Sequence, residues 1–138
     1  MSKAFIDTSG WGNLIDVSQP FHVLATEWYG NARQQSFQFV TSNYILAELV
    51  ALLESPLRIP LKKAIAFLKS LRTSSTVDIV HIDVDLDAES WKLLEDRRDK
   101  AWSLVDCSSF AIMQQLNINQ TLTSDRHFEQ AGFIRLLK

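Results

Sequence analysis

Four acidic residues lie where the chain is expected to pass from a strand into a helix or to open a helix. They are Asp7 in FIDTSGW, Glu48 in TSNYILAELV, Asp106 in WSLVDCSSF and Asp125 in TLTSDRHFEQAGF. No local motif connects them, so only a fold that brings strand ends together can unite them. Clustered carboxylates repel one another, and a bound cation removes that repulsion. The four residues therefore predict a divalent-cation site suited to phosphodiester chemistry.

Each acid also has a purely structural interpretation. Asp7 precedes Thr-Ser-Gly, which is good turn chemistry, and Glu48 falls at the edge of an apolar helical stripe, where glutamate is usually solvated. Asp106 follows Ser103 at the spacing of a capping box, and Asp125 is suited to cap the next helix. A functional role is favoured most for Asp106, because its helix is apolar on nearly every side and an unpaired carboxylate there needs a partner.

Apolar spacing, caps and turn residues predict strands that alternate with helices. The expected strands cover residues 3–7, 37–41, 77–82, 120–123 and 133–137. The expected helices cover residues 11 onward, 20–33, 44–53, 60–71, 87–97, 103–116 and 127–131, with Trp91 among the anchors of the fifth. Such alternation is typical of an α/β sandwich whose ligand crevice lies beyond the carboxyl ends of parallel strands. Asp7 and Asp125 map to that edge.

Length and composition indicate one ordinary globular domain over residues 1–138. Apolar residues make up 46% and charged residues 22% of the chain, without a Pro-, Gly- or Ser-rich tract. A charged residue at position 7 comes too early for a signal peptide, and no segment approaches the roughly 18 apolar residues of a spanning helix. A soluble cytoplasmic protein without membrane contact is therefore expected. The single cysteine, Cys107, is predicted to be a buried thiol rather than a nucleophile.

The net charge of −2 and the pI of about 5.9 lack the basic signature of a nonspecific nucleic-acid binder, so any affinity for nucleic acid must be local. Two basic stretches are candidates: Arg58, Lys62, Lys63, Lys69 and Arg72, and then Arg97, Arg98 and Lys100. For either stretch alone, a solvated helix face is the favoured interpretation.

Oxygen ligands favour Mg²⁺ or Mn²⁺ over zinc, because the three histidines and Cys107 lack the spacing of a zinc site. The histidines are interpreted as surface or partly buried residues, and the tryptophans as core residues. Arg126 and His127 flank Asp125 and could contact a phosphate, although a surface pair is the favoured interpretation.

At these residues the chain resembles the PIN-domain nucleases, and it looks most like a VapC-type toxin of the type II toxin–antitoxin systems. FIDTSGW resembles the opening strand with its first acid, and TSNYILAEL the helix that carries the glutamate. WSLVDCSSFAIM resembles the segment of the third acid, and LTSDRHFEQAGF that of the fourth acid and the closing strand. The resemblance spans nearly the whole chain. It implies a PIN-like three-layer α/β/α sandwich with a mostly parallel central sheet.

The resemblance also implies a metal-dependent endoribonuclease. The ligands of Mg²⁺ or Mn²⁺ would be Asp7, Glu48, Asp106 and Asp125. Thr8 and Ser124 would supply supporting hydroxyl groups, and Arg126 is a candidate for contact with the RNA substrate. The implied partners are RNA, an antitoxin that obstructs the acidic pocket, and a second copy of the chain in a homodimer.

Two other functions stay open. A PIN-like module could bind RNA or protein without cutting, although four intact acids argue against it. An aspartyl-phosphate phosphotransferase would use Asp7 as its nucleophile. Such enzymes usually carry a second aspartate where this chain has Ser9, and their essential lysine has no evident counterpart, so this function is disfavoured.

Overall fold

The computed structural model describes residues 2–138, and a parallel β-sheet runs through their centre. Its strands are β1 (Lys3–Ile6), β2 (Gln38–Ser42), β3 (Val77–Val80), β4 (Gln120–Leu122) and β5 (Ile134–Arg135). They lie in the order β3-β2-β1-β4-β5, and every neighbouring pair is parallel. The predicted α/β class is confirmed, although β5 is shorter than the expected strand at 133–137.

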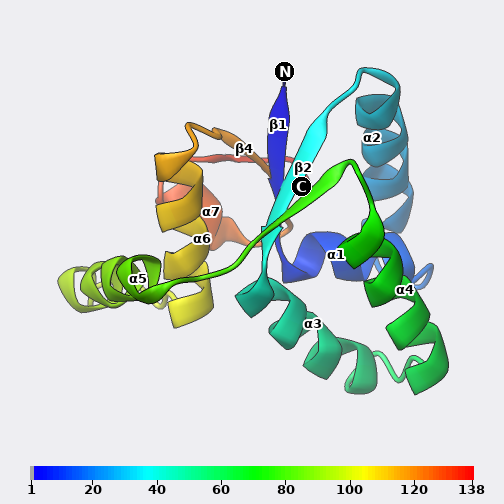
Figure 1. Cartoon of the computed structure of the whole chain (residues 1–138), viewed down its shortest axis with the longest axis horizontal. Helices are drawn as coiled ribbons and strands as arrows, with labels where there is room; N and C mark the ends of the chain where they lie inside the picture. The colour runs from blue at the N-terminus through cyan, green and yellow to red at the C-terminus, as the bar shows by residue number, and fades with distance from the viewer. Residues whose placement is uncertain (1) are drawn as a thin grey trace.

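Seven helices accompany the sheet within the described residues. They are α1 (Thr8–Ile15), α2 (His22–Gln34), α3 (Asn43–Glu54), α4 (Leu61–Thr73), α5 (Val84–Asp96), α6 (Leu104–Gln115) and α7 (Arg126–Gln130). Figure 1 shows α1, α2 and α4 to one side of the central strands and α5, α6 and α7 to the other. Helix α3 follows β2 directly and extends beyond the carboxyl ends of the strands. The layers are those of an α/β/α sandwich.

The central strand β1 sets the position of the site. Ala4, Phe5 and Ile6 are fully buried, as expected for a parallel strand with both faces covered by helices. Strands β1 and β4 pair side by side, with Ile6 next to Leu122. The residues that follow these two strands therefore meet at the same edge of the sheet.

Helix α1 approaches β4 very closely, and Gly10 makes this approach possible. A Cβ atom on Gly10 would lie 2.1 Å from the carbonyl oxygen of Leu122 and 2.8 Å from Cγ2 of Ile6. Both distances are too short for nonbonded atoms. A larger residue at position 10 would therefore push α1, and Asp7 with it, away from β4.

The first helix begins earlier than the sequence predicts. It starts at Thr8 rather than near Trp11, because the Asp7 carboxylate accepts the backbone N–H of Gly10 and acts as the N-cap. Asp7 is thus both the end of a strand segment and the beginning of a helix.

Helix α5 also differs from the prediction. It begins at Val84 rather than at Asp87, because Asp83 caps it by accepting the backbone N–H of Leu86. Trp91 was expected to anchor this helix in the core, but it is 47% exposed. The charged composition of α5 left its inward face ambiguous.

The apolar core contains Cys107, as predicted. Burial raises the pKa of its thiol to about 11, and the nearby Asp106 carboxylate raises it further, so this thiol is unreactive near neutral pH. Trp11 and Trp102 are buried as expected. Across residues 2–138, no helix has the length and apolarity needed to cross a membrane.

Candidate functional site

Asp7 is the most buried of the four predicted acids, with 6% of the residue exposed. Its Oδ1 atom accepts hydrogen bonds from the Ser9 hydroxyl at 2.8 Å and from the Gly10 N–H at 2.9 Å. Its Oδ2 atom accepts from the Thr123 hydroxyl at 2.6 Å, and the same hydroxyl oxygen accepts the backbone N–H of Asp125 at 3.0 Å. A carboxylate offers about four lone-pair positions. One position on Oδ2 therefore stays open for a further ligand.

Burial raises the pKa of Asp7 from 3.8 to about 7. The hydrogen bonds from Thr123, Gly10 and Ser9 lower the pKa and so oppose this shift, whereas the nearby Asp125 carboxylate raises it further. The site therefore holds a carboxylate whose negative charge lacks a compensating positive charge. Within residues 2–138, no lysine or arginine forms an ion pair with any of the four predicted acids. A bound cation would supply the compensating charge.

The raised pKa of Asp7 predicts how the stability of the metal-free protein depends on pH. Between about pH 4 and pH 7 the folded state holds a proton on Asp7 that the unfolded state has released, so this group destabilises the fold as pH rises through that window. We expect the free energy of unfolding of the wild type to fall by a few kcal/mol relative to Asp7→Asn over this range. Urea denaturation of both proteins in EDTA at a series of pH values measures the difference. If the free energies of unfolding of the two proteins change with pH in parallel, the prediction is contradicted.

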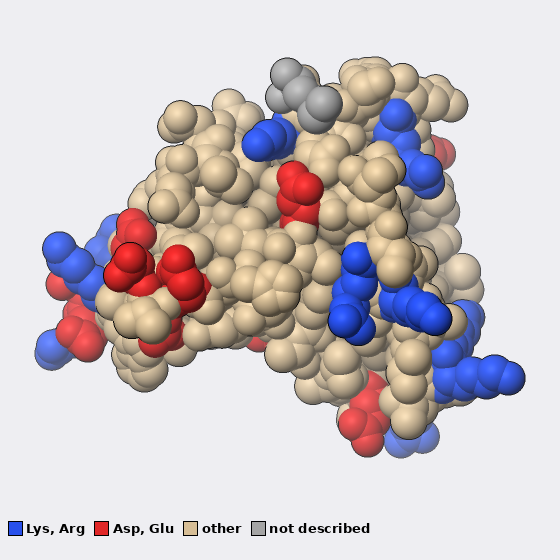
Figure 2. All heavy atoms as spheres, viewed as in Figure 1, with Lys and Arg blue, Asp and Glu red and all other residues tan. Residues whose placement is uncertain are grey.

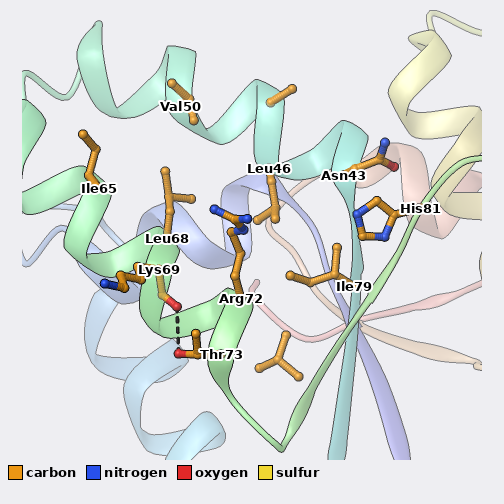
Figure 3. Close-up of a pocket in the computed structure, with 12 residues that line it drawn as sticks. Asn43, Leu46, Val50, Ile65, Leu68, Lys69, Arg72, Thr73, Ile79 and His81 are labelled. Carbon is orange, nitrogen blue, oxygen red and sulfur yellow. Dashed lines mark hydrogen bonds between the residues drawn. The ribbon is translucent and has the colours of Figure 1, made fainter.

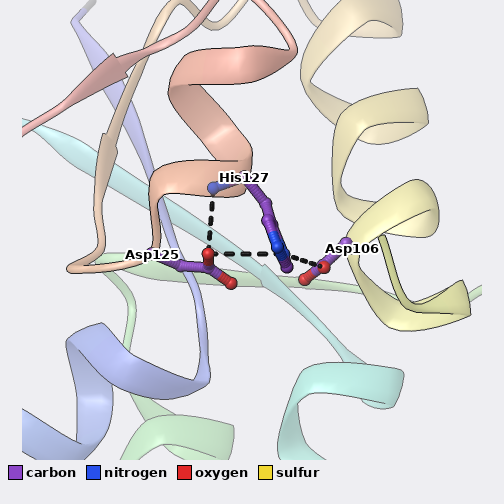
Figure 4. A group of neighbouring side chains, drawn as sticks. All are labelled: Asp106, Asp125 and His127. Carbon is purple, nitrogen blue, oxygen red and sulfur yellow. Dashed lines mark hydrogen bonds and ion pairs between the residues drawn. The ribbon is translucent and has the colours of Figure 1, made fainter. Parts of the chain in front are cut away.

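A tight group of possible metal ligands among the described residues consists of Asp106, Asp125 and His127. Each of the three offers one ligand atom, and these atoms all lie within 4.8 Å of one another. Nδ1 of His127 lies 3.0 Å from Oδ2 of Asp106 and 3.4 Å from Oδ1 of Asp125. Figure 4 shows the three side chains converging from the first turn of α6 and the start of α7. The imidazole thus lies between two carboxylates that the sequence predicted separately.

Local capping positions both carboxylates. Asp106 and Ser103 form the predicted capping box, in which the Asp106 carboxylate accepts the Ser103 N–H at 3.1 Å and the Ser103 hydroxyl accepts the Asp106 N–H at 3.0 Å. Asp125 is the predicted N-cap of α7 and accepts the N–H of His127 at 2.9 Å. These caps fix the carboxylates and leave part of each exposed, so the structural and functional interpretations coexist.

The interpretation of Arg126 and His127 as a surface pair is correct for Arg126 and wrong for His127. Arg126 is exposed, whereas the ring of His127 turns inward to Asp106 and Asp125. The Asp125 cap orients the first turn of α7 so that consecutive residues point in different directions. Sequence spacing gave no signal for this contact, because it depends on how α7 packs against α6.

Glu48 reaches the site through Thr8. The Thr8 hydroxyl donates a hydrogen bond of 2.5 Å to Oε1 of Glu48, which links α3 to the residue that follows Asp7. Glu48 is otherwise exposed, as expected at the edge of an apolar stripe. Ser124 contributes its backbone N–H, which donates to the Ser9 hydroxyl at 3.0 Å. Ser9 joins both strand ends, and the sequence did not single it out.

The donor set fits a divalent cation. Two partly exposed carboxylates and an imidazole lie together, next to a buried carboxyl group with a raised pKa and an open lone pair. Carboxylate oxygens suit both Mg²⁺ and Mn²⁺, and imidazole is also a suitable ligand for transition metals.

Comparison with known proteins identifies the family. The chain matches the PIN domain family over residues 4–134. It is 30% identical over 132 residues to the 23S rRNA-specific endonuclease VapC20 from two strains of Mycobacterium tuberculosis, with 96% of each protein covered.

Solved structures agree with this match. The crystal structure of Mycobacterium tuberculosis VapC20, a sarcin-ricin loop cleaving toxin, superposes with a TM-score of 0.85 at 28% identity, over 96% of this chain and 97% of that chain. FitAcB from Neisseria gonorrhoeae has a TM-score of 0.61 at 16% identity over 96% and 94% of the two chains, which supports the fold alone. The chain therefore belongs to the PIN-domain family and is a homologue of a VapC-type toxin.

Proposed function

We propose that this protein is a VapC-type toxin that hydrolyses RNA phosphodiester bonds with the help of a divalent cation. The observation that carries the proposal is the convergence of Asp106, Asp125 and His127 within 4.8 Å, beside the buried Asp7 carboxyl group. Membership of the PIN-domain family and the likeness to an rRNA endonuclease support the reaction class.

The proposed ligands of Mg²⁺ or Mn²⁺ are Asp7, Glu48, Asp106 and Asp125. When bound, such a cation supplies charge neutralisation at the scissile phosphate and a lowered pKa for an attacking water. The protein's own hydroxyl groups orient the carboxylates: Thr123 holds Asp7, and Thr8 holds Glu48. The role of the Ser124 hydroxyl stays a prediction.

We further propose that His127 keeps the two outer carboxylates in place. Its ring lies between Asp106 and Asp125, so it separates two like charges and restrains their rotation. Exposed Arg126, next to Asp125 in sequence, is proposed to contact a phosphate of the substrate.

The proposed substrate is the sarcin-ricin loop of 23S rRNA. VapC20 cleaves this loop, and its similarity to the present chain extends over 96% of both proteins. A ribosomal substrate would place the protein in the cytoplasm. An antitoxin that covers the acidic pocket and a second copy of the chain are the proposed protein partners.

The surroundings of Asp7 disfavour the phosphotransferase alternative. Such an enzyme needs a lysine beside its nucleophile, and within residues 2–138 no lysine forms an ion pair with Asp7, whose hydrogen bonds come from Ser9, Gly10 and Thr123. A phosphoaspartate trapped at Asp7 would revive this alternative.

Removal of metal tests the proposed function. We expect purified protein to cut a synthetic sarcin-ricin hairpin at one position with Mg²⁺ or Mn²⁺, to stop in EDTA, and to recover when either ion is returned in excess. Mapping of the cleaved ends by primer extension gives the readout, and a hairpin with a scrambled loop is the control. Cleavage that continues in EDTA would disprove metal dependence, and binding without any cleavage would favour the silent binding module.

A further inference from the structure

One stretch outside the proposed active site carries positive charge alone. Residues 55–77 contain five basic residues and no acidic residue, although acids outnumber bases in the whole chain. The five are Arg58, Lys62, Lys63, Lys69 and Arg72. Within the described residues, none of them forms an ion pair. Their charges are therefore available to an outside partner.

The second basic stretch behaves differently. Arg97 and Lys100 lie 3.2 Å and 3.8 Å from the carboxylate of Asp99, and Arg98 donates to the backbone carbonyl of Glu95 at 3.1 Å. This stretch is partly neutralised by its own neighbours. Figure 2 shows the same contrast at the surface, with basic side chains gathered where Figure 1 places α4 and acidic and basic side chains mixed around α5.

Helical geometry gathers three of the free cations into one row. Lys62, Lys69 and Arg72 are seven and three residues apart and therefore lie on one side of α4, about 15 Å from end to end. All three are exposed, whereas Ala64 and Leu71 on the other side of the helix are buried. We call these three residues the α4 stripe.

Two residues of the α4 stripe line a groove that α4 shares with α3, the helix that carries Glu48. Lys69 and Arg72 line a groove of about 900 Å³ between α3, α4 and β3, which Figure 3 shows with both side chains projecting from α4. On α3 the groove is lined by Asn43 and Ala47, and Ala47 immediately precedes Glu48. Helix α3 therefore carries both one wall of the groove and Glu48, on different faces of the helix.

We propose that the α4 stripe binds the phosphate backbone of the RNA substrate outside the acidic pocket. This inference rests on the proposed function. An acidic pocket in a protein of net charge −2 does not attract a polyanion, so the substrate needs a separate cationic surface close to it. A row of three cations over about 15 Å can contact about three successive phosphates of one strand. The cations are exposed along the outer side of the helix, where a backbone can reach them.

The test compares two charge-matched triple variants. One is Lys62→Gln, Lys69→Gln and Arg72→Gln, and the control is Arg97→Gln, Arg98→Gln and Lys100→Gln. Fluorescence anisotropy of a labelled sarcin-ricin hairpin in EDTA measures binding without cleavage. We expect the α4 variant to bind about tenfold more weakly or worse at low salt, and its plot of log K against log salt to be shallower by about 2. The control variant should bind like the wild type, and circular dichroism melts check that all three proteins fold.

Cleavage separates this inference from the proposed function. An oligonucleotide too short to reach α4 should be cut equally well by the wild type and the α4 variant, whereas the hairpin should be cut more slowly by the variant. Equal hairpin binding by the two proteins overturns the inference. The inference is also overturned if the α4 variant keeps its affinity for RNA but loses a protein partner that copurifies with the wild type. In that case the α4 stripe binds protein. If the wild type binds the hairpin through the α4 stripe but cuts neither RNA, the inference about the α4 stripe stands. The proposed nuclease function is then disproved.

Discussion

Replacing Asp7 with Asn is expected to abolish RNA cleavage and to leave the fold intact. Asparagine is also a good N-cap, so it can still accept the Gly10 N–H that begins α1. It loses the negative charge that would hold the cation. A cation contributes several kcal/mol of transition-state stabilisation, and about 1.4 kcal/mol corresponds to a tenfold change in rate, so we expect kcat/KM to fall by roughly 10²- to 10⁴-fold.

The readout is kcat/KM on the sarcin-ricin hairpin together with the melting temperature of the metal-free protein. Melting near neutral pH should occur at the wild-type temperature or above it, since the uncompensated charge of Asp7 is gone. Glu27→Gln is the control, because it removes one exposed carboxylate on α2 and should change neither value. Undiminished cleavage by Asp7→Asn would exclude this carboxylate from the site.

The second large effect is expected at Gly10. In Gly10→Ala the new methyl group would lie 2.1 Å from the Leu122 carbonyl oxygen, which belongs to the backbone of β4 and cannot move aside as a flexible side chain can. Either α1 or β4 must shift, and we expect a loss of about 3 kcal/mol or more in the free energy of unfolding. Cleavage should also fall in the protein that remains folded, because the shift separates Asp7 from Thr123.

Gly30→Ala is the matched control for this change. Gly30 lies inside α2, and nothing lies within 4 Å of a Cβ atom placed there, so alanine should stabilise the helix by about 0.5–1 kcal/mol. Urea denaturation of both variants gives the comparison. If Gly10→Ala unfolds at the wild-type urea concentration, the close approach of α1 to β4 is not essential to the fold.

The order and type of the elements could be predicted because their signals are local. Ser103 and Asp125 were recognisable as caps, and alternating strands and helices imply a parallel sheet whatever the exact boundaries. The start of α5 was misplaced because Asp83 and Asp87 are both suitable caps, and the choice depends on packing against α6.

The candidate site was less predictable than the fold. Its carboxylates lie at strand ends and helix caps, which sequence patterns reveal. The residues that join them do not follow any pattern: Thr123 contacts Asp7 across 116 positions, and His127 contacts Asp106 across 21. Those contacts depend on the register between β1 and β4 and on the packing of α7 against α6, and both are properties of the assembled chain.

The pairing of β1 with β4 has a consequence for the synthesis of the protein. The proposed site needs groups from both ends of the chain, because the carboxylate of Asp7 is oriented by Thr123 and lies near Asp125. A ribosome that has made only the first hundred or so residues therefore carries a chain without a complete nuclease site. Fragments that end before β4 would lack both Thr123 and Asp125, so a nascent chain would complete the proposed nuclease site only after these residues have been made.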